Sequence, residues 1–410
     1  MKVFERYFER NPLFFQPGFQ NGLEGIVIIP VLNDRDIFST IDSLCNCTCC
    51  EGNMGVIIVV NHNEACCSEI KIANKELFDE IRHYTDRKQQ EKPEISFAVV
   101  KAFDLPAKYA GVGLARKIAI DAAAFYFYQN GKPDGPILSL DADTLVDQDY
   151  TDQVCRFFRT HSVAGVSIAY AHRLEECSED TFEAMIKYEL YLRYYQLAMA
   201  YTGHPHAYHC IGSAFAVRAS DYVAQGGMNK RQAGEDFYFL QKLISTGRYA
   251  LLNTTRVYPS PRFSDRTPFG TGQSVRQIAE NRGNYPVYHW EAFLDLKHCF
   301  SGVSRLYKAD QQAVLAYINQ QPIGVRDFLT EIDGNGLFAE VNANCASLHQ
   351  FHRRFFDHFN AFRVLKYLNY VHEEVYTKMD ISQAIALLFD ALGYPLAERD
   401  RDKLEFLRNL

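Results

Sequence analysis

Two aspartates one residue apart, Asp141 and Asp143, follow the short apolar run at 136–140. Carboxylates at the end of a buried strand stay ionised only beside a compensating positive charge. A hard divalent cation supplies that charge, because Mg²⁺ and Mn²⁺ bind carboxylate oxygens and share their remaining positions with phosphates and water. The pattern is therefore typical of a site that binds a metal ion and a phosphate, although a strand ending in a solvated acidic turn has the same local sequence.

A second acidic pair, Glu235 and Asp236, lies further along the chain, between a glycine-containing segment and a helical pattern at 237–245. At the start of a helix, the helix dipole favours an ionised carboxylate. A carboxylate held in this form can act as a general base. The alternative interpretation is an ordinary pair of acidic residues in the first turn of a helix.

Short apolar runs alternate with helical patterns in the first part of the chain. The runs lie at 26–29, 56–60, 95–100 and 137–140, and the helical patterns between them lie at 36–44, 70–84 and 113–128. Strands that are apolar throughout and separated by helices predict a parallel sheet covered on both faces. Ligands of such sheets bind beyond the carboxyl ends of the strands, where Asp141 and Asp143 fall.

The rest of the chain predicts further organisation. The charged segment 86–93 predicts a solvated surface connection, and beyond about residue 284 helical patterns dominate, notably at 351–371. We therefore predict an α/β protein with a mostly parallel central sheet flanked by helices and a helical C-terminal subdomain. The predicted boundaries are an N-terminal extension at 1–23, the α/β domain at 24–283 and the helical subdomain at 284–410.

Composition excludes several classes of function. The chain of 410 residues is 47% hydrophobic and 23% charged, with a net charge of -7, as in an ordinary globular protein without a general attraction for nucleic acid. Residues 1–7 lack the apolar core of a secretory signal, and no stretch is long and apolar enough to cross a bilayer. These features predict a cytoplasmic protein without a nucleic-acid partner, and they leave contact with the inner face of a membrane and the oligomeric state open.

Two clusters of metal-ligating residue types have simpler interpretations. Six of the eleven cysteines lie within 45–67, but their spacing differs from the paired C-x-x-C of zinc sites, so it favours reduced thiols packed near one helix end. His204, His206 and His209 favour a polar loop, with a third ligand to the metal ion as the alternative.

Taken in order, these motifs resemble the family 2 glycosyltransferases of the GT-A fold, over about residues 25–247. Asn61 stands where that family usually presents an aspartate to the nucleotide base, and an amide can recognise a different base edge. The resemblance implies donor-nucleotide contacts from Pro30, Val31, Asn33, Asp34, Asn61, Gly113, Arg116 and Asp141, acceptor-side contacts from Gly212 and Ser213, a metal ion on Asp143 and Asp141, and catalysis by Asp236 with Glu235 second.

The resemblance also implies a reaction, namely inverting transfer of a sugar from a nucleotide-sugar donor to the hydroxyl of a glycan, lipid-linked or other acceptor. Asp236 would take the proton of the attacking hydroxyl, and Mg²⁺ or Mn²⁺ on Asp143 would neutralise the departing diphosphate. The segment 270–277 faintly resembles the Gln-x-x-Arg-Trp motif of processive relatives but lacks its tryptophan. It predicts a loop, flanked by Arg266 and Arg276, that closes over the diphosphate.

Two other function classes remain open at this point. Haloacid-dehalogenase-like phosphatases also place an Asp-x-Asp after an apolar strand, with the first aspartate as nucleophile, but they need Thr or Val where this chain has Leu145. A sugar-nucleotide or glycan-binding module without turnover would keep the fold. Such a module has no need for four carboxylates at Asp141, Asp143, Glu235 and Asp236.

Overall fold

The computed structural model describes residues 2–410 apart from 49–51, 231–233, 263–270 and 282. The chain divides into two compact units. The first consists of Met1–Glu176 and Cys210–Gln273, and the second of Cys177–His209 and Ser274–Leu410. The boundaries at 23/24 and 283/284 stay a prediction.

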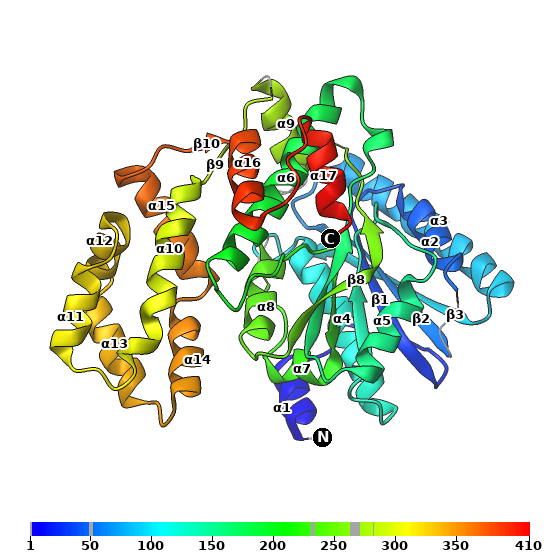
Figure 1. The fold of residues 1–410 in the computed structure, drawn as a ribbon. Helices are drawn as coiled ribbons and strands as arrows, with labels where there is room; N and C mark the ends of the chain where they lie inside the picture. Colours follow the sequence, from blue (N-terminus) through cyan, green and yellow to red (C-terminus); the bar gives the residue numbers. More distant parts are fainter. Residues whose placement is uncertain (1, 49–51, 231–233, 263–270, 282) are drawn as a thin grey trace. The chain divides into compact units, whose positions relative to one another are not determined.

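The first unit contains an eight-stranded sheet with the strand order β3-β2-β1-β4-β7-β6-β8-β5 (Figure 1). Strands β3, β2, β1 and β4 are mutually parallel, β6 is parallel to β8, β7 is antiparallel to both β4 and β6, and β5 is antiparallel to β8. The strands are Leu23–Val31 (β1), Asn53–Asn63 (β2), Ile95–Leu105 (β3), Pro136–Ser139 (β4), Leu145–Val146 (β5), Gly165–Tyr170 (β6), Phe215–Arg218 (β7) and Tyr249–Tyr258 (β8).

The apolar runs of the sequence form the central strands. Ile26, Val27, Ile28 and Ile29 in β1 are all fully buried, which is the burial expected of a β-branched strand covered on both faces. The predicted runs at 56–60 and 95–100 lie within β2 and β3. The predicted α/β fold class, with a mostly parallel sheet flanked by helices, is confirmed.

Helices connect and cover these strands. Helix α2 contacts α3, α4 contacts β1 and β2, and the N-terminal helix α1 contacts α7. The helices of this unit are Lys2–Arg10 (α1), Ile37–Cys45 (α2), Ser68–Glu91 (α3), Val112–Gln129 (α4), Tyr150–Thr160 (α5), Ala219–Ala224 (α7) and Glu235–Ile244 (α8).

The predicted surface connection at 86–93 is wrong for most of its length, because α3 continues to Glu91. No helix breaker occurs before Pro93, and Lys88 forms ion pairs with Asp42 of α2 at 2.8 Å and with Glu91 at 3.6 Å. The charges therefore lie on a helix surface, where i,i+3 pairs support the helix, and the connection begins only after it.

The connections place a switch in strand order between β1 and β4. The chain passes from β1 to β2 to β3 on one side of β1 and then returns to β4 on the other side. Ile28 of β1 pairs with Ser139 of β4, so the two strands end side by side. In open α/β sheets, the crevice beyond the carboxyl ends at such a switch point is where ligands bind.

The second unit is helical, apart from the antiparallel strands Pro286–Val287 (β9) and Met379–Asp380 (β10). Its long helix α6 contacts α16 and α17, and Arg408 of α17 pairs with the buried Glu189 of α6 at 2.7 Å. The helices are Glu179–Tyr201 (α6), Trp290–Gly302 (α10), Gln311–Asn319 (α11), Ile323–Glu331 (α12), Gly334–Ala343 (α13), Leu348–His358 (α14), Ala361–Glu374 (α15), Ile381–Leu392 (α16) and Asp400–Arg408 (α17), with Thr271–Glu280 (α9) across the unit boundary.

The helical pattern at 351–371 belongs to two helices, α14 and α15. The break falls at Asn360, whose side-chain oxygen accepts hydrogen bonds from the backbone N–H groups of Phe362 and Arg363. This N-cap starts a new helix in spite of the continuous apolar periodicity. Among the helices in the described ranges, none is both long enough and apolar enough to span a bilayer.

Candidate active site

Acidic side chains gather beyond the ends of β1 and β4 in the first unit. Asp34 and Asp36 follow β1, and Asp141 and Asp143 follow β4, whose last hydrogen bond runs from Leu140 N to Ile28 O at 3.1 Å. Because β1 and β4 are neighbours and parallel, the two acidic segments meet at the same edge of the sheet. The predicted position of the Asp-x-Asp motif at a strand's carboxyl end is confirmed.

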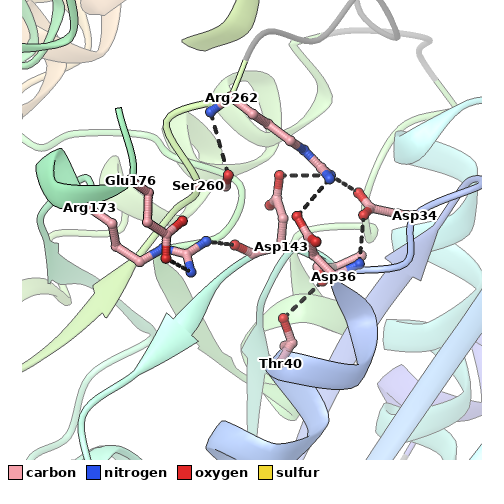
Figure 2. Close-up of polar contacts among 9 residues, drawn as sticks. Asp34, Asp36, Thr40, Asp143, Arg173, Glu176, Ser260 and Arg262 are labelled. Atoms are coloured by element: carbon pink, nitrogen blue, oxygen red, sulfur yellow. Dashed lines mark hydrogen bonds and ion pairs between the residues drawn. The ribbon is translucent and has the colours of Figure 1, made fainter. Parts of the chain in front are cut away.

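Arg262, which follows β8, lies between these two acidic segments (Figure 2). Its Nη1 atom donates to Asp36 Oδ2 at 2.7 Å, and its Nη2 atom contacts Asp143 Oδ2 at 3.1 Å and donates to Asp34. One guanidinium group therefore contacts three carboxylates from two different loops. Neither Arg262 nor Asp36 was among the residues predicted for the site.

A second arginine, Arg116 near the start of α4, joins the two acidic motifs of the sequence. Its Nη2 atom donates to Asp141, and its Nη1 atom donates to Glu235 at the start of α8. Arg116 and Glu235 are almost completely buried, with 3% and 1% of their surfaces exposed. The strand-end aspartates and the Glu235-Asp236 pair are thus parts of one cluster, as the sequence interpretation requires.

Burial raises the pKa of several carboxyl groups in this cluster. The pKa of Asp143 is raised to about 7, mainly by burial and also by the negative charge of Asp141, while Arg262 opposes the shift. Burial likewise raises the pKa of Glu235 and of Asp236, with Arg116 opposing both shifts. The loss of solvation on burial is thus the main cause of the raised pKa values, and neighbouring carboxylates add to it.

Glycine at position 212 makes room for Arg116. A Cβ atom at Gly212 would lie 2.5 Å from Arg116 Nη2, which is closer than real side-chain contacts. The Gly212 carbonyl accepts a hydrogen bond from Ser139 Oγ of β4 at 2.7 Å, and the next residue, Ser213, is buried. Gly212 and Ser213 therefore lie directly beside the end of β4, and Gly113 is buried in the first turn of α4.

A buried asparagine, Asn74 of α3, connects the two segments predicted to hold the nucleotide base. Its Oδ1 atom accepts from the backbone N–H of Asn33 at 2.7 Å, and its Nδ2 atom donates to the carbonyl of Asn61 at 3.0 Å. Asn33 has a positive φ of 45°, a conformation that asparagine tolerates better than most residues. Pro30 and Val31, also predicted as donor contacts, are buried within β1.

Asn74 was not among the residues predicted for the site. An asparagine inside a helical pattern indicates a side-chain hydrogen bond but does not identify its partner.

Lys117, the residue after Arg116, is buried as well. Its Nζ atom pairs with Asp121 at 2.9 Å and donates to the hydroxyl of Tyr7 at 2.8 Å, and Tyr222 also donates to Asp121 at 2.6 Å. This buried network attaches α1 to α4 and α7, so the contribution of Lys117 is structural.

The histidine segment lies in the second unit. His204 is buried there, with Nε2 at 2.9 Å from the carbonyl oxygen of Phe359 and its ring against Phe356, and burial lowers the pKa of His204 to about 4. His204 therefore packs as a neutral core residue. Within the described ranges, no group of three or more His, Cys, Asp or Glu residues is arranged to hold a metal ion.

Part of the predicted closing loop, with Arg266 and Gly270, lies outside the described residues. Gly272 and Arg276 belong to helix α9 instead of a loop. Cys49 and Cys50 of the cysteine cluster also lie outside the described residues. Cys45 and Cys47 are free thiols, and burial raises the pKa of Cys45 to about 11.

Residues 136–295 match the family model of glycosyl transferase family group 2. No curated protein matches the chain. Among solved structures it resembles S. aureus TarS 1-349 in complex with UDP-GlcNAc, with 13% identity over 81% of this chain and 90% of that chain and a TM-score of 0.40. It also resembles mannosyltransferase PcManGT from Pyrobaculum calidifontis in complex with GDP-Man and Mn²⁺, with 14% identity over 99% of this chain and 92% of that chain and a TM-score of 0.39.

The family match covers part of the chain, residues 136–295, and the identity to the two solved structures is only 13% and 14%. An α/β sheet with a switch point and acidic loops at that point accompanies the match to glycosyl transferase family group 2 over residues 136–295. The part of the chain at 136–295 is therefore similar to family 2 glycosyltransferases, as the resemblance in the sequence predicted.

Proposed function

We propose that the protein transfers a sugar from a nucleoside-diphosphate sugar to an acceptor hydroxyl, with inversion and with the help of Mg²⁺ or Mn²⁺. The observation that carries this proposal is the position of Arg116, which donates to Asp141 of the strand-end motif and to Glu235 of the second acidic pair. The donor half and the acceptor half of the reaction thereby share one buried cluster. The acceptor is a glycan, a lipid-linked sugar or another alcohol in polysaccharide or glycoconjugate synthesis.

The charge balance of the cluster fits a divalent cation. Among the described residues, six carboxyl groups gather here and the guanidinium groups that pair with them are those of Arg116 and Arg262. The carboxyl groups are those of Asp34, Asp36, Asp141, Asp143, Glu235 and Asp236. An uncompensated site of this kind would repel a diphosphate. Carboxylate oxygens are also the ligands that Mg²⁺ and Mn²⁺ prefer. Asp143, with Asp141 beside it, would hold the ion.

Each acidic residue then has a defined role. The ion, when bound, neutralises the negative charge that develops on the leaving diphosphate. Asp236 accepts the proton of the acceptor hydroxyl as its oxygen attacks the anomeric carbon. Burial raises the pKa of Asp236, which makes its carboxylate a stronger base than an exposed aspartate. Glu235, fixed by Arg116, orients the start of α8 and hence Asp236.

The donor base is recognised at the ends of β1 and β2. Asn74 fixes the backbone of Asn33 and Asn61, so these two segments present a rigid surface to the nucleotide. With Asn61 in place of the family's aspartate, this surface offers an amide donor as well as an acceptor. The transferase domain comprises residues 24–283, and the helical residues 284–410 stay available for acceptor, membrane or subunit contacts.

A thermal-shift panel tests this function. UDP-, GDP-, CMP- and dTDP-sugars are each added with Mn²⁺ or Mg²⁺, since a ligand that binds only the folded state raises the melting temperature. We expect a metal-dependent rise for one nucleotide class, its loss in Asp143→Asn and its retention in Asp152→Asn, which changes an aspartate paired with Arg156 on α5. A rise of equal size in Asp143→Asn would contradict the assigned metal site.

Turnover distinguishes an enzyme from a binding module. Release of nucleoside diphosphate from the donor identified in the panel is the readout for transfer or slow donor hydrolysis. Binding without any release, with water or a range of sugar acceptors present, would favour the non-catalytic module.

A further inference from the structure

Arg262 occupies the place between Asp143 and the acidic loop after β1 (Figure 2). It contacts Asp36 at 2.7 Å and Asp143 at 3.1 Å, and it also donates to Asp34. The atoms that face this guanidinium are carboxylate oxygens from two loops, which is the donor set a divalent cation would require. The side chain of Arg262 therefore places a positive charge beside Asp143, the residue proposed to bind the metal ion.

The other arginine near Asp143 makes a different contact. Arg173 donates from Nη2 to the backbone carbonyl oxygen of Asp143 at 3.0 Å, and its Nη1 atom pairs with Glu176 at 2.7 Å (Figure 2). Arg173 thus binds the backbone of the loop that contains Asp143, whereas Arg262 contacts the Asp143 carboxylate. Of these two arginines, Arg262 is the one that contacts the oxygen a metal ion would use.

Two features distinguish Arg262 from a permanent structural cation. Its side chain is 32% exposed, whereas that of Arg116 is 4% exposed, so water can replace the contacts of Arg262 at smaller cost. The single positive charge of Arg262 also cannot neutralise three carboxylates. A divalent ion beside Asp143 would compensate them more completely and would repel the guanidinium.

We propose that Arg262 is an internal counter-ion that holds Asp34, Asp36 and Asp143 together in the donor-free site and is exchanged for the divalent cation when the donor site fills. This inference rests on the proposed function, because it requires a metal site at Asp143. Arg262 and the metal ion therefore compete for the same carboxylate, and removing Arg262 makes the metal ion bind more tightly in the absence of any nucleotide.

Titration of the nucleotide-free protein with Mn²⁺, followed by the electron paramagnetic resonance signal of the free ion, tests the competition directly. Arg262→Gln should bind Mn²⁺ about tenfold more tightly than the natural chain, the effect of removing one competing, partly exposed ion pair. Arg262→Lys should fall between them, because a lysine ammonium is a point charge that cannot bridge three carboxylates. The lysine variant also provides the test if the glutamine variant does not fold.

Arg35→Gln is the matched control, since Arg35 lies between Asp34 and Asp36 in the sequence but pairs with Glu80 of α3. Its Mn²⁺ affinity should equal that of the natural chain. Unchanged or weaker Mn²⁺ binding by Arg262→Gln would overturn the inference.

Asp143→Asn separates this inference from the proposed function. Loss of Mn²⁺ binding in Asp143→Asn, with no gain in Arg262→Gln, overturns the exchange and leaves the metal site standing. Mn²⁺ binding that is unaffected by Asp143→Asn, or absent from both the natural chain and Arg262→Gln at millimolar Mn²⁺, overturns the proposed metal site and the exchange together.

Discussion

The candidate site contains two arginine-centred clusters that differ in burial. The side chain of Arg116 is 4% exposed, and its partners Glu235 and Asp141 are 2% and 36% exposed. The side chain of Arg262 is 32% exposed, and its partners Asp34, Asp143 and Asp36 are 4%, 24% and 46% exposed. The chemistry of the contacts is the same in both clusters. The energetic consequences differ, because breaking a buried ion pair leaves an uncompensated charge and breaking an exposed one does not.

This difference assigns different work to the two clusters. Arg116 links the start of α8 to the loop after β4, and under the proposed function this link fixes the base relative to the donor site. Under the same proposal, the more exposed Arg262 releases its carboxylates when a metal ion and a donor enter.

The first prediction concerns Asp236, on the buried side of the site. Asp236→Asn should lower turnover by about 10²–10⁴-fold, because the acceptor hydroxyl loses its base. Binding of Mn²⁺ and of the nucleotide should stay within about twofold of the natural chain, since Asp143 and Arg262 are untouched. Steady-state kinetics and calorimetric titration measure the two effects. Equal losses in turnover and in metal binding would contradict the separate roles of the two clusters.

Asp236 also predicts a pH dependence. Burial raises its pKa above the ordinary value of about 4. Because the base acts in its ionised form, kcat/KM should fall as the pH decreases through this raised pKa. The acidic limb of the profile should be missing from the residual activity of Asp236→Asn. An unchanged limb in that variant would assign the ionisation to another group.

The second prediction compares the arginines by stability. Arg116→Gln should lower the free energy of unfolding by about 3–5 kcal/mol, because Glu235 is left buried without its cation. Arg262→Gln should lower it by less than about 2 kcal/mol, because the guanidinium and two of its three partners, Asp36 and Asp143, are partly exposed to water. Urea unfolding at neutral pH measures both. Losses of equal size would contradict the comparison.

The third prediction uses the close approach of Gly212 to Arg116. Gly212→Ala should cost about 1–3 kcal/mol of stability, because its Cβ would displace the guanidinium. Gly18→Ala is the control, since no atom lies within 4 Å of a Cβ at Gly18. The same unfolding experiment applies. A neutral Gly212→Ala would show that Arg116 can shift without cost.

Much of the fold could be predicted from the sequence because its signals are local. The β-branched run of Ile26 to Ile29 can be buried only in a strand covered on both faces, and the alternation with helices then implies parallel strands. The same local signals gave wrong helix boundaries at two places. Charges at 86–91 extend α3, and Asn360 divides an apolar pattern that looked continuous.

The site was predictable only in part. Asp141, Asp143, Glu235 and Asp236 could be predicted as candidates because acidic residues at strand ends and helix starts have a local physical meaning. Arg262 was not found, since it meets Asp34 across 228 residues of sequence and follows its strand without any recognisable spacing. Contacts of this kind are set by the order of strands in the sheet, which periodicity does not specify.

The central claim is that a divalent cation held at Asp143 is needed for turnover of a nucleotide sugar in this site. Donor turnover measured by release of nucleoside diphosphate, with Mn²⁺ or with a chelator, tests it most directly. The account predicts turnover in the natural chain that chelation abolishes, that added Mn²⁺ restores and that Asp143→Asn does not recover at any Mn²⁺ concentration. Full turnover by Asp143→Asn, with the same dependence on Mn²⁺ as the natural chain, would contradict it.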